Sequence, residues 1–230
     1  MRSVKKVWAT IASTALTATI LAGGAAPSMA AEDLTASDRA AASTLDLSTT
    51  EYREVKSLGE EGKLELWAGG KKFSPKRSTN LPVGIAAAYQ PKTWGACGVR
   101  TDNYKHVRTW RVTTAPWQAK DIVMKCGTWT SKNPNGGWGY RHVKGKHGGE
   151  WAALGNQVQA NWRDIADFAI TDALDNIYSG SERASNNTFT YKGEVQLRKY
   201  NGSVIRTYYT RVTADQTDRR LITAFYSSSR

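Results

Sequence analysis

The sequence has few cysteines and only one long apolar run. Both shortages limit the classes of protein to which the chain can belong. The apolar run, ATIASTALTATILAGG, follows three basic residues near the N-terminus and precedes Ser28-Met29-Ala30. This order is typical of a secretory signal peptide, here residues 1–30 with cleavage after Ala30. No later stretch reaches the ~18 consecutive apolar residues that a membrane span requires. No cysteine follows the cleavage site to carry a lipid anchor. We therefore expect a secreted protein without a membrane span.

Cys97 and Cys126 are the only two cysteines. A lone pair of cysteines in an exported protein is usually oxidised, so we expect one disulfide that joins them. Two buried free thiols are the alternative. Closing a loop of this length would stabilise the fold by about 3 to 4 kcal/mol through chain entropy. Neither cysteine has metal-ligand spacing to a histidine, and the sequence predicts no metal site and no cofactor.

Acidic residues are scarce relative to basic ones. The chain has 20 Asp and Glu against 32 Lys and Arg, a formal net charge of +12, and the expected signal peptide carries three of those positive charges, which leaves +9. A basic secreted protein is expected to meet a polyanion such as nucleic acid, an acidic envelope polymer or an anionic membrane. Charge alone does not choose among these partners.

Composition divides the rest of the chain into three parts. Residues 31–50 are small, polar and alternately acidic, which predicts a flexible leader or propeptide. Residues 51–130 are predicted to be a small β-rich region, because HVRTWRVTT and DIVMKCGTW have the composition of strands. The disulfide would staple this region. SKNPNGGWG then marks a break, and residues 131–230 form the predicted second domain.

The second domain is predicted to contain a helix followed by a series of strands. Over residues 161–178 the apolar residues recur with the period of one buried helical face, and Asn161 is a suitable N-cap. NTFTYK, EVQLRKY, SVIRTYYTRVT and RRLITAFY then follow as strands, with a hairpin turn at Asn201-Gly202. We expect an α+β fold in which helices cover one face of a roughly four-stranded antiparallel meander. The other face would be open.

The segment HVKGKHGGEW, residues 142–151, holds two of the three histidines. On a regular helix Lys144 and His147 share a face, whereas His142 and His147 lie ~140° apart and are not expected to act as an acid–base pair. The ammonium groups of Lys144 and Lys146 would disfavour a positive charge on His147 and leave a neutral imidazole that accepts a proton. The same lysines would bind a phosphate. A solvated basic turn is the alternative.

The last strand, RRLITAFY, adds a second group of candidate residues. Alternation along a strand places Thr223 and Phe225 on one face and Ile222 and Ala224 on the other. If Ile222 and Ala224 pack on the helix, the hydroxyl and the aromatic ring lie on the open face, where they suit a phosphate next to a stacked base. An ordinary amphipathic strand is the alternative.

KGKHGGEWAALGN, the helix NWRDIADFAITDALDN and a strand meander that ends in LITAF together resemble the colicin D-like catalytic domain of the barnase, EndoU, colicin and RelE-like toxin ribonucleases. The resemblance covers about residues 140–230. It implies five site residues, which are Lys144, Lys146, His147, Thr223 and Phe225. The lysines would bind the phosphate, the histidine would be the general base, and the hydroxyl and ring would complete the site. The family has serine and tryptophan where this chain has threonine and phenylalanine, which affects substrate positioning.

The resemblance implies a secreted, metal-independent endoribonuclease toxin that uses the ribose 2′-hydroxyl, with RNA as its substrate. Several members of the family cleave tRNA, which makes tRNA one candidate, but the particular RNA does not transfer to this chain. An acidic immunity protein is an expected partner. Substrate-binding side chains are expected beside the site and on the central strands, at His142, Arg198, Arg206 and Arg211. A generic solvated sheet face is the alternative for the arginines. The alternative function is a non-catalytic secreted module that binds an acidic or carbohydrate polymer of the cell envelope.

Overall fold

The computed structural model describes residues 34–74, 92–176, 178, 182–184 and 186–229. Residues 34–230 form one compact unit, so the predicted domain boundary near residue 131 falls inside that unit. The predicted signal peptide lies outside the described residues. Within the described part of the chain, no helix has the length and apolar character needed to cross a membrane.

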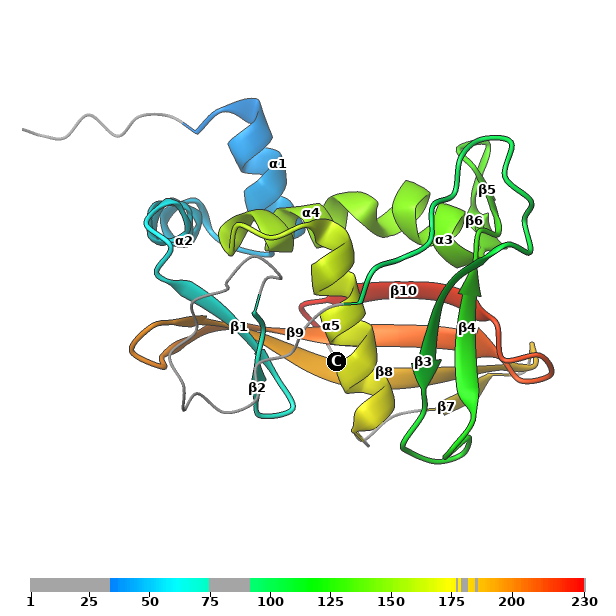
Figure 1. Cartoon of the computed structure of the whole chain (residues 1–230). Helices are drawn as coiled ribbons and strands as arrows, with labels where there is room; N and C mark the ends of the chain where they lie inside the picture. Colours follow the sequence, from blue (N-terminus) through cyan, green and yellow to red (C-terminus); the bar gives the residue numbers. More distant parts are fainter. Residues whose placement is uncertain (1–33, 75–91, 177, 179–181, 185, 230) are drawn as a thin grey trace, which may run out of the picture. The chain divides into compact units, whose positions relative to one another are not determined.

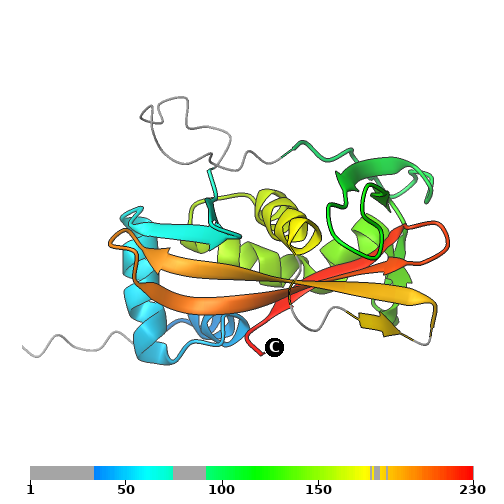
Figure 2. The same cartoon turned by 90° about the horizontal axis from the view of Figure 1, so that it is seen from below.

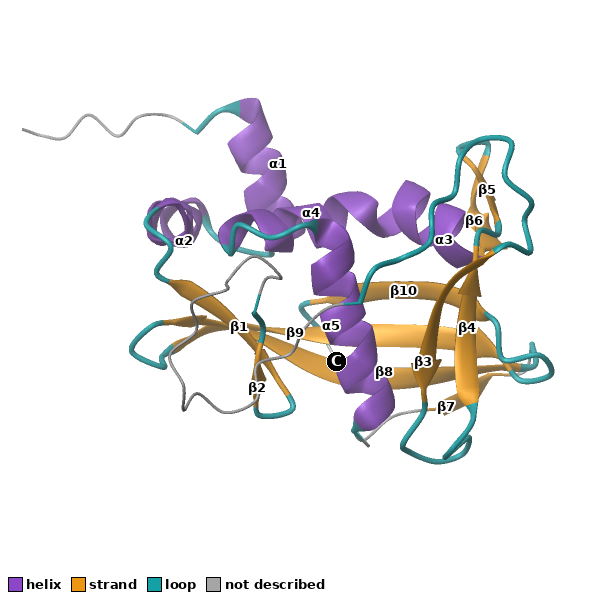
Figure 3. Ribbon diagram, in the orientation of Figure 1, coloured by secondary structure: helices purple, strands orange, loops and turns teal. Residues whose placement is uncertain are grey.

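The unit is α+β, as the sequence predicts (Figures 1 and 3). The helices are α1 (Ala36–Thr44), α2 (Thr49–Glu60), α3 (Gly139–His142), α4 (Gly148–Gln157) and α5 (Trp162–Asp175), with a π-helical turn η1 (Val143–His147). The strands are β1 (Leu64–Ala68), β2 (Lys71–Lys72), β3 (His106–Arg111), β4 (Asp121–Lys125), β5 (Thr128–Thr130), β6 (Asn133–Trp138), β7 (Glu182–Ala184), β8 (Thr188–Lys199), β9 (Val204–Asp215) and β10 (Leu221–Ser227).

The main sheet has the strand order β10-β9-β8-β1-β2, and β7 pairs with β8. The stretch expected to form two strands, NTFTYK and EVQLRKY, is the single strand β8, so the meander has three strands and β1 extends it. Gly193 lies inside β8 because α5 crosses the strand there, where a Cβ atom would come within 2.9 Å of Ala173. The glycine therefore marks a close helix–sheet approach.

Helices α4 and α5 cover one face of the sheet, and the strands lie in front of them in Figure 2. Helix α5 begins at the predicted cap, since the Asn161 side chain accepts a hydrogen bond from the Arg163 N–H. Burial alternates along β8, β9 and β10, so every second side chain packs in the core and the others lie on the opposite face. The predicted arrangement of helices on one face is confirmed.

The segment expected to be flexible, residues 31–50, contains α1 and the beginning of α2; residues 31–33 are outside the described part. Ser48 and Glu51 form a capping box at the start of α2. Leu45 is fully buried, and its carbonyl accepts a hydrogen bond from the Tyr208 hydroxyl. The small polar composition misled the prediction because the capping residues and a few leucines are enough to fix this segment.

The disulfide between Cys97 and Cys126 is present, with 5.6 Å between the Cα atoms. Strands β3 and β4 form a hairpin beside it, and the predicted break SKNPNGGWG contributes β6, which pairs with β5. Arg141 of α3 holds the disulfide loop to the helix. Its guanidinium donates hydrogen bonds at 2.6 to 2.7 Å to four oxygens, those of Gly98, Thr101, Asn103 and Gly127.

Asp172 of α5 makes the stability of the fold depend on pH. Burial raises the pKa of Asp172 to about 6, against hydrogen bonds from Tyr178, the Glu194 N–H and Asn176 that lower it. Between pH ~4 and ~6 the folded state therefore binds more protons at this carboxyl than the unfolded state. The free energy of unfolding falls as the pH rises through that window. A rise in pKa from 3.8 to about 6 corresponds to about 3 kcal/mol.

The variant Asp172→Asn is expected to lack this contribution. Urea unfolding of both proteins at several pH values between ~4 and ~7 measures the difference in free energy of unfolding. The stability of the variant relative to the unsubstituted protein should increase by about 3 kcal/mol as the pH rises across this range. Two curves that run parallel in pH would contradict this assignment.

Candidate active site

The two histidines of HVKGKHGGEW are brought together by a π-helical turn. The chain passes from α3 through η1 into α4, and the five residues Val143–His147 form the π-helix. A π-helix forms hydrogen bonds from residue i to i+5, so residues five apart lie closer to the same face than they do on an α-helix. The ring centroids of His142 and His147 are 5.7 Å apart. The prediction that they point ~140° apart is wrong, because it assumed the period of a regular α-helix.

Gly145 allows the π-turn to pack closely against β5. A Cβ atom at this position would lie 2.2 Å from the Trp129 ring. Only a residue without a side chain fits here unless Trp129 moves. The lysines on either side, Lys144 and Lys146, are exposed, and Lys146 Nζ donates a hydrogen bond of 2.9 Å to Asn135 Oδ1. The predicted phosphate ligands therefore lie at the surface of the histidine-bearing turn.

His142 is only 4% exposed, and its tautomer is fixed by the backbone. Its Nδ1 lies 2.8 Å from the Gly136 carbonyl oxygen. A carbonyl only accepts hydrogen bonds, so Nδ1 carries the proton and Nε2 keeps a lone pair. Burial lowers the pKa of His142, with a smaller contribution in the same direction from the charges of His147 and Lys146. The ring is therefore neutral near pH 7 and suited to accept a proton.

His147 is 6% exposed and is held by a carboxylate and an aromatic ring. Its Nδ1 lies 3.1 Å from both carboxylate oxygens of Glu150, so Nδ1 donates to an acceptor that is negatively charged when ionised. The imidazole stacks on Phe225 of β10, with ring centroids 4.9 Å apart and planes tilted by 17°. The π-turn and the last strand thus meet at this histidine.

Thr223 and Phe225 share a face of the last strand, as predicted, but the Thr223 hydroxyl is buried and not open to a phosphate, and an irregularity lies beside the pair. Phe225 pairs with Arg211 and Thr223 pairs with Thr213, so Thr223 and Phe225 are two apart in one ladder. Ala224 is buried, but Ile222 lies where the register shifts and is only partly buried. The expected packing of Ile222 on the helix is therefore wrong, because the irregularity turns the strand at that residue. The Thr223 hydroxyl is buried without a hydrogen-bond partner among the described residues.

Of the three predicted arginines, one lies across the ladder from Phe225, the residue that stacks on His147. Arg211 is the cross-strand neighbour of Phe225. Arg206 is five residues away along β9, about 17 Å at the usual rise per residue, and forms an ion pair with Asp46. Arg198 donates to Gln196 and lies over the Trp67 ring at 5.1 Å. Arg198 and Arg206 therefore belong to the other end of the strands.

Two contacts of the site were missed by the sequence analysis. Glu150 follows His147 by three residues, and this spacing on one helix face is a readable signal for the pair. The Gly136 carbonyl that holds His142 comes from β6, and no local pattern in the sequence indicates that contact. In the described part of the chain, no group of three or more His, Cys, Asp and Glu side chains is arranged to hold a metal ion.

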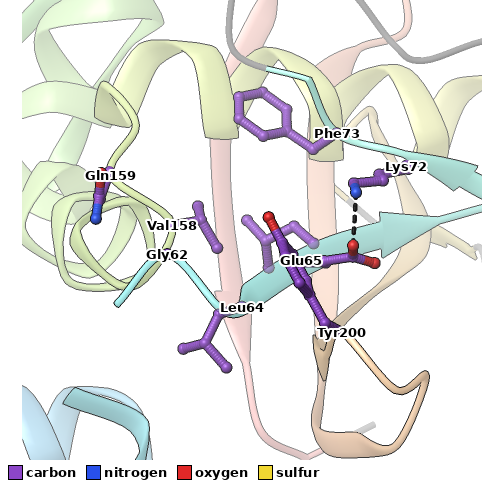
Figure 4. Close-up of a pocket in the computed structure, with 9 residues that line it drawn as sticks. Gly62, Leu64, Glu65, Lys72, Phe73, Val158, Gln159 and Tyr200 are labelled. Atoms are coloured by element: carbon purple, nitrogen blue, oxygen red, sulfur yellow. Dashed lines mark hydrogen bonds and ion pairs between the residues drawn. The ribbon is translucent and has the colours of Figure 1, made fainter. Parts of the chain in front are cut away.

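A separate hollow of about 220 Å³ lies beside β1 and the β8–β9 turn (Figure 4). Its charged lining residues are already paired, because Lys72 Nζ lies 2.5 Å from Glu65 Oε1. Tyr200 also lines the hollow. It lies eight residues beyond Lys192, which is the β8 residue in register with Arg211, so the hollow and the histidine pair are at different ends of the sheet. The histidine pair has the reactive groups that this hollow lacks, so we take the pair as the candidate active site.

Two proteins of Mycobacterium tuberculosis are similar to this chain: uncharacterized protein MT0764 of strain CDC 1551 / Oshkosh and uncharacterized protein Rv0739 of strain ATCC 25618 / H37Rv. Each is 33% identical over 165 residues, which covers 66% of this chain and 57% of the relative. The matched part thus spans little more than half of each relative. No family model matches the chain, and no solved structure matches it. Neither relative's name states an activity, so the functional argument depends on the geometry of the site.

Proposed function

We propose that this protein is a secreted endoribonuclease in which His142 and His147 act together on one phosphodiester. The observation that carries the proposal is the pair of buried imidazoles, with centroids 5.7 Å apart, on a π-helical turn. One ring donates to a backbone carbonyl and the other to a carboxylate. Because these hydrogen-bond partners differ, one ring is suited to remove a proton and the other to supply one.

His142 is the better candidate for the general base. Its Nε2 has a free lone pair because Nδ1 is committed to Gly136, and its lowered pKa keeps it neutral. In the proposed reaction Nε2 takes the proton of the ribose 2′-hydroxyl, and the 2′-oxygen forms a bond to the adjacent phosphorus. The sequence analysis gives this role to His147, but the contacts of the two rings favour His142.

His147 is the better candidate for the general acid. The Glu150 carboxylate accepts the hydrogen bond from Nδ1, and the general acid is the form of this ring that also carries a proton on Nε2. From this protonated ring, Nε2–H gives its proton to the 5′-oxygen as the bond between phosphorus and that oxygen breaks. The products are a 2′,3′-cyclic phosphate and a free 5′-hydroxyl. The proton taken by His142 and the proton given by His147 balance.

Cations near the pair would stabilise the charge on the phosphate. Lys144 and Lys146 are on the same turn as His147, and Arg211 is the cross-strand neighbour of Phe225. The resemblance of residues 140–230 to colicin D-like ribonucleases agrees with this chemistry. It makes tRNA the first RNA to test and an acidic immunity protein a partner to look for.

The proposal is tested by incubating the purified protein, from residue 31 onward, with total RNA and with tRNA in the presence of EDTA. Cleavage to fragments with 2′,3′-cyclic phosphate ends is expected. His147→Ala purified in the same way controls for contaminating ribonuclease. Intact RNA with a protein shown to be folded would overturn the proposal and favour a non-catalytic module that binds an acidic or carbohydrate envelope polymer.

A further inference from the structure

An exposed tyrosine lies on the surface near the histidine-bearing turn. Tyr104 is 61% exposed, which is unusual among the large apolar side chains of the described residues. Its ring lies against Trp138, with centroids 5.5 Å apart and planes tilted by 47°. Two aromatic rings in contact at the surface provide an apolar area that folding has not covered.

Cations flank both rings. Lys125 Nζ lies 5.3 Å from the centroid of the Tyr104 ring. Arg220 Cζ lies 4.9 Å from the centroid of the Trp138 ring, and its guanidinium is 3.8 to 3.9 Å from Asp218 and Asp215. The order is cation, ring, ring, cation, built from four segments that are far apart in the sequence. Such a cluster combines π-faces with positive charge.

The cluster is held by rigid structure rather than by a free loop. The Tyr104 N–H donates a hydrogen bond of 2.6 Å to Asp102 Oδ1. The neighbouring residue Asn103, two other residues of the disulfide loop and Gly127 just after it are bound by the guanidinium of Arg141. A surface that is already ordered loses little entropy when a ligand binds to it.

The cluster is also directly connected to the proposed active site. Trp138 is the N-cap of α3, the helix that ends at His142. Gly136, two residues before Trp138, supplies the carbonyl that fixes the His142 tautomer. The cluster and the histidine pair are therefore joined by one short segment of chain, residues 136–142.

We infer that Tyr104 and Trp138, with Lys125 and Arg220, form a stacking platform for unpaired bases of single-stranded RNA bound at the histidine pair. Bases stack on aromatic rings whatever their identity. Lys125 is placed to hold a phosphate between them, and Arg220, which pairs with Asp215 and Asp218, supports the Trp138 ring. A base-paired strand keeps its bases inside the duplex and cannot use the platform. The inference rests on the proposed function and names its substrate class as single-stranded RNA.

The test uses the protein from residue 31 onward and a fluorescein-labelled single-stranded 2′-deoxyoligonucleotide, which lacks the hydroxyl needed for cleavage. Fluorescence anisotropy gives Kd. Tyr104→Ala is expected to raise Kd about 5- to 150-fold, which corresponds to the ~1 to 3 kcal/mol of one stacked base. Tyr104→Phe should restore binding, because it keeps the ring.

Tyr200→Ala is the matched control. Tyr200 is 63% exposed and has Lys72 Nζ 5.2 Å from its ring centroid, but it lies at the other end of the sheet. Its substitution should leave Kd unchanged. Lys125→Ala should reduce the slope of log K against log salt by about 0.7, the value for one single-strand phosphate contact.

The inference is overturned if folded Tyr104→Ala binds the oligonucleotide as tightly as the unsubstituted protein, or if Tyr200→Ala weakens binding equally. The outcome is separable from that of the proposed function. Binding that depends on Tyr104, in a protein that leaves RNA intact, would support the platform and remove the nuclease. Cleavage by a protein whose binding does not depend on Tyr104 would do the reverse.

Discussion

Replacing His147 with alanine is expected to lower the rate of RNA cleavage by about 10²- to 10⁴-fold, the usual contribution of one acid or base group. The ring is buried between Phe225 and the Glu150 carboxylate, and in the proposed mechanism it delivers the proton. His142→Ala is expected to have an effect of the same order, since it removes the neutral ring beside it. Single-turnover cleavage of end-labelled tRNA measures both rates.

His106 provides the matched control for this experiment. It is the third histidine of the chain, it is exposed at the start of β3, and its Nε2 contacts the Thr109 hydroxyl at 2.7 Å. His106→Ala should retain the full rate. The double variant of His142 and His147 should be little slower than either single variant, because groups that act as one unit have non-additive effects. Unchanged cleavage by folded His147→Ala would contradict the proposed mechanism.

Replacing Asp167 with alanine is expected to reduce the free energy of unfolding by about 3 to 5 kcal/mol, the cost of breaking a buried ion pair from one side. The Asp167 side chain is fully buried and lies 2.8 Å from Arg108 Nε. It also accepts hydrogen bonds from Trp94 Nε1 and from the backbone N–H of Lys92. These contacts join α5 to β3 and to the segment before it, and alanine would leave the guanidinium buried without its partner.

An exposed ion pair on the β3–β4 hairpin, which also carries Arg108, is the control for Asp167. Arg111 NH1 lies 3.2 Å from Asp121 Oδ1, and both side chains are well exposed. Asp121→Ala should change stability by less than ~1 kcal/mol. Thermal unfolding should show a fall in Tm of about 6 to 20 °C for Asp167→Ala, given ~2 to 4 °C per kcal/mol for a protein of this size. A fall no larger than that of Asp121→Ala would show that the buried pair contributes little.

The sequence predicts the local elements that have a clear period or a strong turn signal. The apolar spacing and the Asn161 cap locate α5, and Asn201-Gly202 locates the β8–β9 turn. The two cysteines predict the disulfide from compartment and number alone. The helix and the turn each rest on a pattern within a short stretch of sequence. The disulfide rests on there being one possible pair of cysteines.

Long-range pairing leaves no such pattern. β1 adds to the edge of β8, with Leu64 opposite Lys199, and nothing near either residue indicates the other. The N-terminal helices are a different case, because Ser48 and Glu51 have the spacing of a capping box, a local signal that the prediction from composition did not use. The packing of Leu45 in the core then depends on Tyr208, which is distant in the sequence.

The active-site geometry was predicted least well, and the reason is physical. With the 3.6-residue period of an α-helix, the side chains of His142 and His147 would point in different directions. The π-helical turn instead places the two rings together. Gly145, which packs against Trp129, permits this turn, but a glycine in a basic segment also fits a solvated connector. The sequence singles out the turn that carries both histidines, and only the backbone shows that the two rings form a pair.

The pH dependence of kcat/KM for RNA cleavage tests the central claim most directly. The account predicts a bell-shaped profile, because His142 must be neutral to accept a proton and His147 must be protonated to donate one. The residual activity of His142→Ala should lose the acidic limb, and that of His147→Ala should lose the alkaline limb. A profile that keeps both limbs in each variant would contradict the proposal that these two imidazoles perform the reaction.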